Sequence, residues 1–371
     1  MIAISTGIGL QQKIREKLSG FTGHIQVTNF DSNNSEITLE PVSKNQDFYP
    51  EFTTVSNVKN VQVFATKAGI IRTETDFEGI IFKGVSEDYD WTFFKTYLVE
   101  GNLPCFSGEV SNEVLISKEI SNRLQIHLGD EFNILFVKED PSKAPWIRVV
   151  KAVGVYNSGF MEFDENFVIA DIRHIQKMNR WSESEVGGFE VILNDFNEID
   201  SKSEAIYAQT GATLNSESVV EKYPGIFEWI NLFDTNIYLI IAIMILVAGI
   251  NMITALLVLI LERTQMVGIL KALGSSNISI RKVFLYNAGY LILRGLFWGN
   301  LIGLAILLIQ KYTGIVTLDS ETYYVNEVPI YLDFGYVLLL NLGTLELCLV
   351  MLIVPSIVIS KINPAKSIKF E

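Results

Sequence analysis

Few side chains in this 371-residue chain have the type and spacing that catalysis or metal binding requires. The three histidines, His24, His127 and His174, stand far apart and lack the short spacing of metal ligands. The two cysteines, Cys105 and Cys348, are too few for a disulfide framework or a thiolate metal site. The sequence therefore predicts no metal site and no catalytic cluster, which argues against an enzyme.

Nucleotide binding is not expected of this chain either. The stretch GILKALGSS at 268–276 contains glycines, but no lysine follows the second one, so it does not match GxxxxGK[ST]. The net charge of −13 and the lack of a basic patch with interleaved aromatic residues argue against a nucleic-acid partner. We expect no cofactor bound by the chain itself.

Two ionisable residues, Arg294 and Glu346, lie inside long apolar stretches. Counted from the basic residues Lys282 and Lys361 at ~1.5 Å per residue, their depths differ by about 5 Å. Because a charge within a bilayer normally finds a partner, the pattern predicts an intramembrane Arg294–Glu346 ion pair. Two alternatives remain. The long Arg294 side chain extends to the lipid headgroups, or Glu346 is protonated and hydrogen-bonded, for instance to Asn341.

The apolar stretches predict three membrane spans, at about 237–261, 283–310 and 336–360, each long enough for a core that needs ~20 residues. A short polar-to-amphipathic piece, ERTQMVGILKALG at 262–274, separates the first two. The excess of lysine and arginine around it predicts the cytoplasmic side, whereas the loop 313–333 carries acids and no lysine or arginine. The lipid bilayer is therefore one expected partner.

This topology places residues 11–236 outside the cytoplasm. We therefore expect residues 1–22 to be the end and extension of a first transmembrane helix whose remainder precedes Met1. The alternative is a domain that stays inside. Residues 23–233 form the expected extracytoplasmic domain and 234–371 the transmembrane domain.

The expected extracytoplasmic domain mixes strands and helices, so the fold class is α+β. Runs rich in β-branched and aromatic residues predict strands at 24–28, 61–65, 79–85, 113–117, 167–171 and 189–193. Helices are predicted at 117–130, closed by Gly129, at 172–178 and at 198–209. EFNILFV and WIRVVKAVGVY predict a long hairpin.

The tip of that hairpin, residues 138–146, combines proline with an exposed aromatic residue. Pro141, Pro145 and Trp146 are the candidate contacts of a recognition loop. The alternative is a stiff turn without a partner.

Two surfaces of the transmembrane domain are candidate interfaces. The piece 262–274 has apolar residues on one helical face, namely Met266, Ile269, Leu270 and Leu273. Arg263 and Lys271 lie off this face. Such a helix lies on lipid or packs on a protein. Gly295, Gly299 and Gly303 share a face of the second span, which allows close helix approach within the chain or between chains.

The order of helix, large outside domain, span, cytoplasmic loop and two spans resembles the FtsX/MacB/LolC-LolE family of ABC transporter permeases. LERTQMVGILKALGSSNISIRKVFL at 261–285 resembles the family's coupling segment. GFTGHIQV at 20–27, VEGNLP at 99–104, EVLISKEISNRLQIHLGD at 113–130 and the terminal INPAKSIKF are most similar to the lipoprotein-releasing LolC/LolE branch. Gln265 stands where many members have an acid, so no contact of that acid is carried over.

This resemblance implies a non-catalytic permease of the bacterial inner membrane, with its large domain in the periplasm. A separate cytoplasmic ABC ATPase would bind the ATP, and a second permease subunit would complete a homo- or heterodimer. The activity implied is lipoprotein release, with MacB-type efflux or an FtsX-like signalling or scaffold role as alternatives. The resemblance also implies that the extracytoplasmic domain has two lobes. One lobe is formed by about 24–90 together with 186–225, and the other by the segment between them. A periplasmic lipoprotein carrier is implied to bind at 138–146. The residues implied to dock the ATPase are Glu262, Arg263, Met266, Ile269, Leu270, Lys271 and Leu273.

Overall fold

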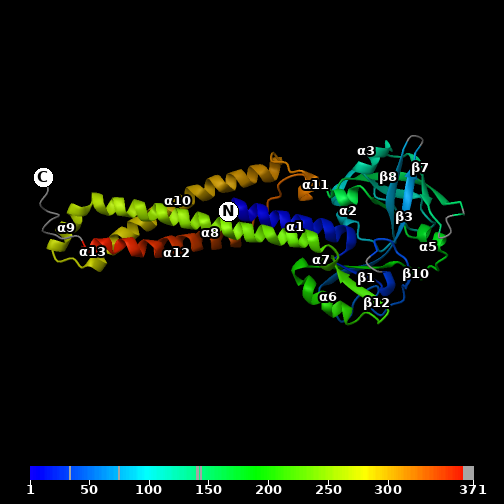
Figure 1. Ribbon diagram of the computed structural model, residues 1–371, viewed down its shortest axis with the longest axis horizontal. Helices are drawn as coiled ribbons and strands as arrows, with labels where there is room; N and C mark the ends of the chain where they lie inside the picture. Colours follow the sequence, from blue (N-terminus) through cyan, green and yellow to red (C-terminus); the bar gives the residue numbers. More distant parts are fainter. Residues whose placement is uncertain (33–34, 74–75, 139–141, 143, 362–371) are drawn as a thin grey trace. The chain divides into compact units, whose positions relative to one another are not determined.

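The computed structural model in Figure 1 describes residues 1–32, 35–73, 76–138, 142 and 144–361. The chain forms two compact units. The helical unit comprises residues 1–11, 228–317 and those from 328 onward, and the α/β unit comprises residues 12–227 and 318–327. The unit boundary therefore differs from the expected one at residue 22, because the second half of the first helix belongs to the α/β unit.

The helical unit contains three helices that are long and apolar enough to cross a membrane, counted over the described residues. They are α8 (Pro224–Glu262), α10 (Asn277–Thr313) and α12 (Phe334–Ser356). The short helix α9 (Thr264–Ala272) joins α8 to α10, and the short helix α13 (Val358–Lys361) follows α12. Side chains from these five helices form one apolar core, including Ile260, Val267, Phe284, Leu352 and Ile359. Most other apolar side chains of the spans face outward, as lipid-facing residues do.

The three predicted spans are all helical, but three of their ends differ from the expected ones by four residues or more. Helix α10 begins at Asn277, where Ser276 caps it, rather than at 283. Helix α8 begins at Pro224 rather than near residue 237, since proline fits the first turn of a helix, where no N–H partner is needed. The last span ends at Ser356 rather than at 360, because Pro355 lies in its final turn and cannot donate a backbone hydrogen bond.

Helix α1 (Ile2–Thr22) ends where Gly23 adopts a φ of +71°. Its second half packs into the α/β unit through Ile14, Leu18 and Phe21, which are all buried. The Phe21 ring stacks on Phe163 with 4.5 Å between ring centroids. The predicted helical extension of the first helix is confirmed, and the ring contact anchors the end of α1 within the α/β unit.

The α/β unit is built on one sheet of ten strands in the order β12-β1-β11-β3-β4-β9-β6-β8-β5, with β7 pairing β3 and β8. Its strands are β1 (Ile25–Asn29), β3 (Val58–Arg72), β4 (Phe77–Val85), β5 (Leu98–Gly101), β6 (Glu113–Ser117), β7 (Glu131–Phe136), β8 (Trp146–Tyr156), β9 (Phe167–Asp171), β11 (Gly188–Leu193) and β12 (Leu214–Ser218). A second, two-stranded sheet pairs β2 (Val42–Ser43) with β10 (Glu185–Val186). The predicted strands and the β7–β8 hairpin are confirmed.

The two expected lobes share this sheet rather than forming separate ones. Strand β3 pairs with β11 through its first half and with β4 and β7 through its second half. The strands of the inserted segment, β5 to β9, gather at the far end together with β4. Thus β4, which was assigned to the first lobe, lies with the second.

Short helices flank the sheet. They are α2 (Thr92–Tyr97), α3 (Lys118–Leu124), α4 (Met161–Asp164), α5 (Arg173–Asn179), α6 (Ile199–Tyr207), α7 (Val219–Lys222) and α11 (Ser320–Tyr323), with 3₁₀ turns at Phe30–Ser32 and Phe196–Glu198. Ser117 caps α3 as an acceptor for the backbone N–H of Ile120. The expected end of α3 at Gly129 is wrong, because Gln125 takes the left-handed conformation and ends the helix first.

Candidate functional site

The candidate site is the docking segment, residues 262–274, which joins two of the long helices. Helix α8 ends at Glu262 and α9 begins two residues later, where Thr264 Oγ1 donates to the carbonyl of Leu261 at 2.6 Å. Val267 of α9 is completely buried in the core to which α8, α10, α12 and α13 also contribute. The helix therefore has a fixed inner face.

A tight turn holds the other end of α9. Gly274 adopts a φ of +89°, a conformation that side chains rarely allow, and the N–H of Ser275 donates to the carbonyl of Leu270 at 3.0 Å. The Ser276 side chain then accepts from the N–H of Ser279 at 3.2 Å and starts α10. Both ends of the short helix are thus set by local hydrogen bonds.

The outer face of α9 carries three uncovered apolar side chains. Met266 is 38% exposed, Ile269 46% and Leu273 78%. The predicted fourth member, Leu270, packs against the core instead, because α9 is apolar on two sides and the inner one includes Leu270 and Val267. The candidate apolar stripe is therefore Met266, Ile269 and Leu273.

The charged residues of the docking segment also divide between the outer face and the packed inner side. Glu262 and Arg263 are exposed beside the stripe. Lys271 points to the short C-terminal helix, where its Nζ donates to the carbonyl of Ile359 at 2.7 Å. The segment thus presents apolar side chains flanked by two charges, an arrangement suited to binding a protein or a lipid surface.

The hairpin tip is the second predicted site. Trp146 begins β8 opposite Phe136, is 37% exposed, and has the Lys138 ammonium 4.4 Å from its ring centroid. Pro145 is exposed beside it, and Pro141 lies outside the described residues. Two of the three candidates thus stand together on the surface of the α/β unit.

The predicted Arg294–Glu346 ion pair is not found among the ion pairs of the described residues, and both side chains are exposed in the single chain. Glu346 lines a groove between α10 and α12 together with Leu293, and Arg294, the next residue, points about 100° further around α10. The matched depth was insufficient because the residues lie on the wrong helical faces.

A polar contact that the sequence reasoning missed joins the same two helices. The amides of Asn300 on α10 and Asn341 on α12 are hydrogen-bonded at 2.6 Å. Asn341 was considered only as a partner of Glu346. The signal available was an amide in each apolar run, since a polar group there needs a partner.

Three of the four glycines of α10, the predicted Gly295, Gly299 and Gly303, are mostly open. A Cβ added at Gly295 or Gly299 would meet nothing within 4 Å, and one at Gly303 would meet only the Met1 sulfur at 3.8 Å. No other part of the described chain therefore packs on Gly295 and Gly299. Among the described residues there is also no group of three or more His, Cys, Asp or Glu side chains that could hold a metal ion.

Comparison with known proteins places the docking segment within a recognised domain. The family FtsX-like permease C-terminal matches residues 238–364. LolC of Neisseria meningitidis serogroup B, a lipoprotein-releasing system transmembrane protein, is 21% identical, over 100% of this chain and 90% of its own length. LolE of Haemophilus influenzae is 17% identical, over 99% of this chain and 89% of its own.

Among solved structures, the periplasmic region of MacB from Actinobacillus actinomycetemcomitans covers 54% of this chain and 91% of its own, at 13% identity and a TM-score of 0.37. The docking segment, the Asn300–Asn341 contact and the open glycines all lie within the family match. Residues 238–364 match the FtsX-like permease C-terminal family, and the chain is similar over its whole length to LolC and LolE.

Proposed function

We propose that this chain is the permease subunit of an ABC transporter that releases lipoproteins from a bacterial inner membrane. In this proposal the docking segment binds a separate ATPase on the cytoplasmic side, and the α/β unit lies in the periplasm. The ATP is bound by the partner, and the permease itself is not catalytic. The cargo class rests on the names of the relatives, which are lipoprotein-releasing proteins.

The observation that carries the proposal is the two-sided packing of α9. Its inner side chains Val267 and Leu270 are held by four other helices, so a force applied to α9 is transmitted to the spans rather than absorbed by a loose loop. Its outer side chains Met266, Ile269 and Leu273 are uncovered. A short helix fixed on one side and apolar on the other is suited to transmit a partner's movement.

A second permease subunit is part of the same proposal. Gly295 and Gly299 leave one face of α10 open, which permits a second helix to approach its backbone closely. The hairpin tip with Pro145 and Trp146 is the proposed contact of a periplasmic lipoprotein carrier.

Docking is tested by replacing Ile269 and Leu273 together, first with Asp and then with Lys. Leu270 is left intact because it belongs to the core. Both doubles should abolish ATPase binding and stimulation, since each places a charge in an apolar interface, at about 1–3 kcal/mol per buried unpaired polar group. The measurement is co-purification of an ABC ATPase and its activity in the reconstituted complex.

The Lys pair separates docking from lipid binding, because a helix lying on an anionic bilayer tolerates lysine, whose ammonium reaches the headgroups. Retained ATPase stimulation in the Lys double variant would therefore contradict docking. Tyr207→Asp, an exposed aromatic residue of α6 in the other unit, is the matched control and should couple normally.

A further inference from the structure

A row of polar side chains crosses the inner face of the sheet in the α/β unit, where apolar residues are usual. Gln26 of β1 lies opposite Glu217 of β12 on one side and Glu190 of β11 on the other, and Glu190 lies opposite Gln62 of β3. Residues paired in register point to the same face and lie next to one another. We call these four residues the polar rung.

At the centre of the polar rung, the charge of Glu190 is balanced by Lys83, and both carboxylate oxygens accept hydrogen bonds. The Glu190 carboxylate is completely buried and accepts from Lys83 Nζ at 2.6 Å, Gln62 Nε2 at 2.9 Å and Gln26 Nε2 at 3.3 Å. Lys83 also donates to the carbonyl of Phe21 at the end of α1. A buried ion pair of this kind is tolerated only when its remaining lone pairs and protons are used in this way.

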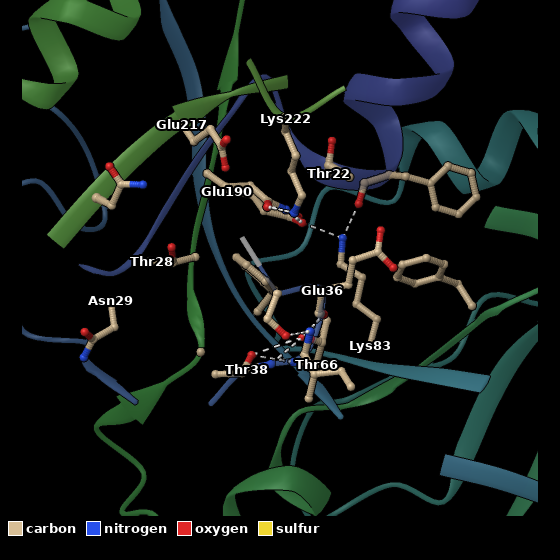
Figure 2. Close-up of a pocket in the computed structure, with 18 of the residues that line it drawn as sticks. Thr22, Thr28, Asn29, Glu36, Thr38, Thr66, Lys83, Glu190, Glu217 and Lys222 are labelled. Carbon is tan, nitrogen blue, oxygen red and sulfur yellow. Dashed lines mark hydrogen bonds and ion pairs between the residues drawn. The ribbon is translucent and has the colours of Figure 1, made fainter. Parts of the chain in front are cut away.

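One end of the rung opens into a pocket of about 250 Å³, which Figure 2 shows. The Lys222 Nζ donates to Gln26 Oε1 at 2.7 Å, so its other two N–H donors have no hydrogen-bond partner in the described part of the chain. Glu217 and Glu36 also line the pocket, and among the described residues their carboxylates accept no hydrogen bond; Thr66 donates only to the backbone carbonyl of Glu36. The pocket therefore has unused donors and unused acceptors.

The charges in the pocket do not cancel. Lys83 and Glu190 neutralise each other, which leaves Glu36 and Glu217 against Lys222 and an excess of one negative charge. Burial lowers the pKa of Lys222, although nearby Glu36 and Glu217 oppose the shift. Burial likewise raises the pKa of Glu217. The Lys222 ammonium and the Glu217 carboxylate are thus partly removed from water. A charged group in such a site is stabilised by an opposite charge bound next to it.

We propose that this pocket binds a primary ammonium that carries a carbonyl group whose carbon is two bonds from the nitrogen, the group found in an amino-acid amide and at the amino end of a peptide. Its ammonium donates to the Glu217 and Glu36 carboxylates, and its carbonyl accepts from Lys222. The single positive charge cancels the excess negative charge. At ~30 Å³ per water, the volume holds on the order of eight non-hydrogen atoms, which fits one aminoacyl unit.

Thr28 and Asn215 extend the same site along the next rung of the sheet. They lie opposite each other in register and both line the pocket. Gly187 closes another wall, where an added Cβ would come within 2.7 Å of the Ala65 backbone, so no larger residue fits there. Polar side chains on paired strands thus form part of the wall beside aromatic ones, and their positions are set by the sheet rather than by a loop.

The test is binding of alaninamide and of trialanine amide to the full chain in lipid nanodiscs, measured by calorimetry and by the shift in thermal unfolding. Both ligands should bind and stabilise the protein, the first representing a free amine and the second a peptide end. N-Acetylalaninamide, which lacks the ammonium, and ethylammonium, which lacks the carbonyl, should bind at least tenfold more weakly. Equal binding of the acetylated compound, or no binding of either amine, would overturn the proposal. If only alaninamide binds, the ligand is a free small molecule rather than a peptide.

Variants locate the site. Glu217→Gln and Glu36→Gln should each weaken alaninamide binding about tenfold to a hundredfold, because each removes a charged hydrogen bond without changing shape. Glu36 is exposed, so its variant should fold normally even if Glu217→Gln does not. Glu204→Gln, an exposed residue of α6 outside the pocket, makes the same charge change and should leave binding unaltered. Unchanged affinity in Glu36→Gln and in folded Glu217→Gln would place the ligand elsewhere. The inference is independent of the proposed transport function.

Discussion

The two units of this chain treat polar groups in opposite ways. In the α/β unit, Lys83 and Glu190 are buried and satisfy each other inside the fold. In the helical unit, Arg294 and Glu346 face outward, and the described contact between polar side chains of α10 and α12 is a pair of neutral amides. The α/β unit therefore pairs this buried charge within the chain, whereas the helical unit presents groups that only a bilayer or another subunit can cover.

The largest expected effect tests the first half of this comparison. Lys83→Met leaves the Glu190 carboxylate buried without its counter-charge, so it should destabilise the α/β unit by about 3–5 kcal/mol. The double variant Lys83→Met/Glu190→Leu should lose much less than the sum of the single losses, because no charge is stranded. The measurement is unfolding of the purified chain followed by intrinsic fluorescence. Additive losses would show that the two residues do not act as a pair.

An intermediate effect concerns pH. Burial lowers the pKa of His24 from 6.5 to about 4, and its Nδ1 accepts from the N–H of Leu193 at 3.3 Å. Between pH 6.5 and 4 the unfolded chain binds a proton that the folded chain does not, so the His24 contribution to stability falls as the pH drops through this window.

The variant His24→Asn keeps an acceptor but does not titrate, so it should be less sensitive to acid than the wild type in the same window. Burial raises the pKa of Asp164 to about 6, which favours the folded state as the pH drops and partly masks the effect. The difference between the unfolding curves of variant and wild type isolates His24. Parallel curves from pH 7 to pH 4 would contradict the assignment.

The smallest effect on the single chain is expected at the open face of the helical unit. Gly299→Leu should leave folding nearly unchanged, because a Cβ there meets nothing within 4 Å, but it should reduce cross-linking between permease subunits. Gly249→Leu is the matched contrast, since its Cβ would come 2.1 Å from the Met351 sulfur and destabilise the chain itself. Normal cross-linking of Gly299→Leu would remove this face as a subunit contact.

Local patterns in the sequence were enough to predict most elements. The strands around Ile25, Val63 and Val168 follow from β-branched and aromatic runs, and the long helices follow from apolar length. Element ends were harder to predict, since Gln125 closes α3 by a left-handed conformation that its residue type does not favour.

Interactions between elements could not be predicted to the same degree. The sequence predicts similar depths for Arg294 and Glu346, but whether their side chains meet depends on the rotation of each helix about its axis, which is set by packing with its neighbours. Helix α9 is apolar on two sides, so periodicity did not show that Leu270 points inward. The polar rung joins Gln26 to Glu190, residues brought together only by the pairing of distant strands.

The length of β3 connects two surfaces that are far apart in the α/β unit. This strand contributes Gln62 to the polar rung at one end and pairs through Ile70–Arg72 with β7, whose hairpin ends near Trp146, at the other. A continuous hydrogen-bonded strand resists stretching and slipping, because a slip of one residue would turn every side chain to the opposite face. A displacement of β3 at the pocket would therefore reach the hairpin as a tilt of the whole strand.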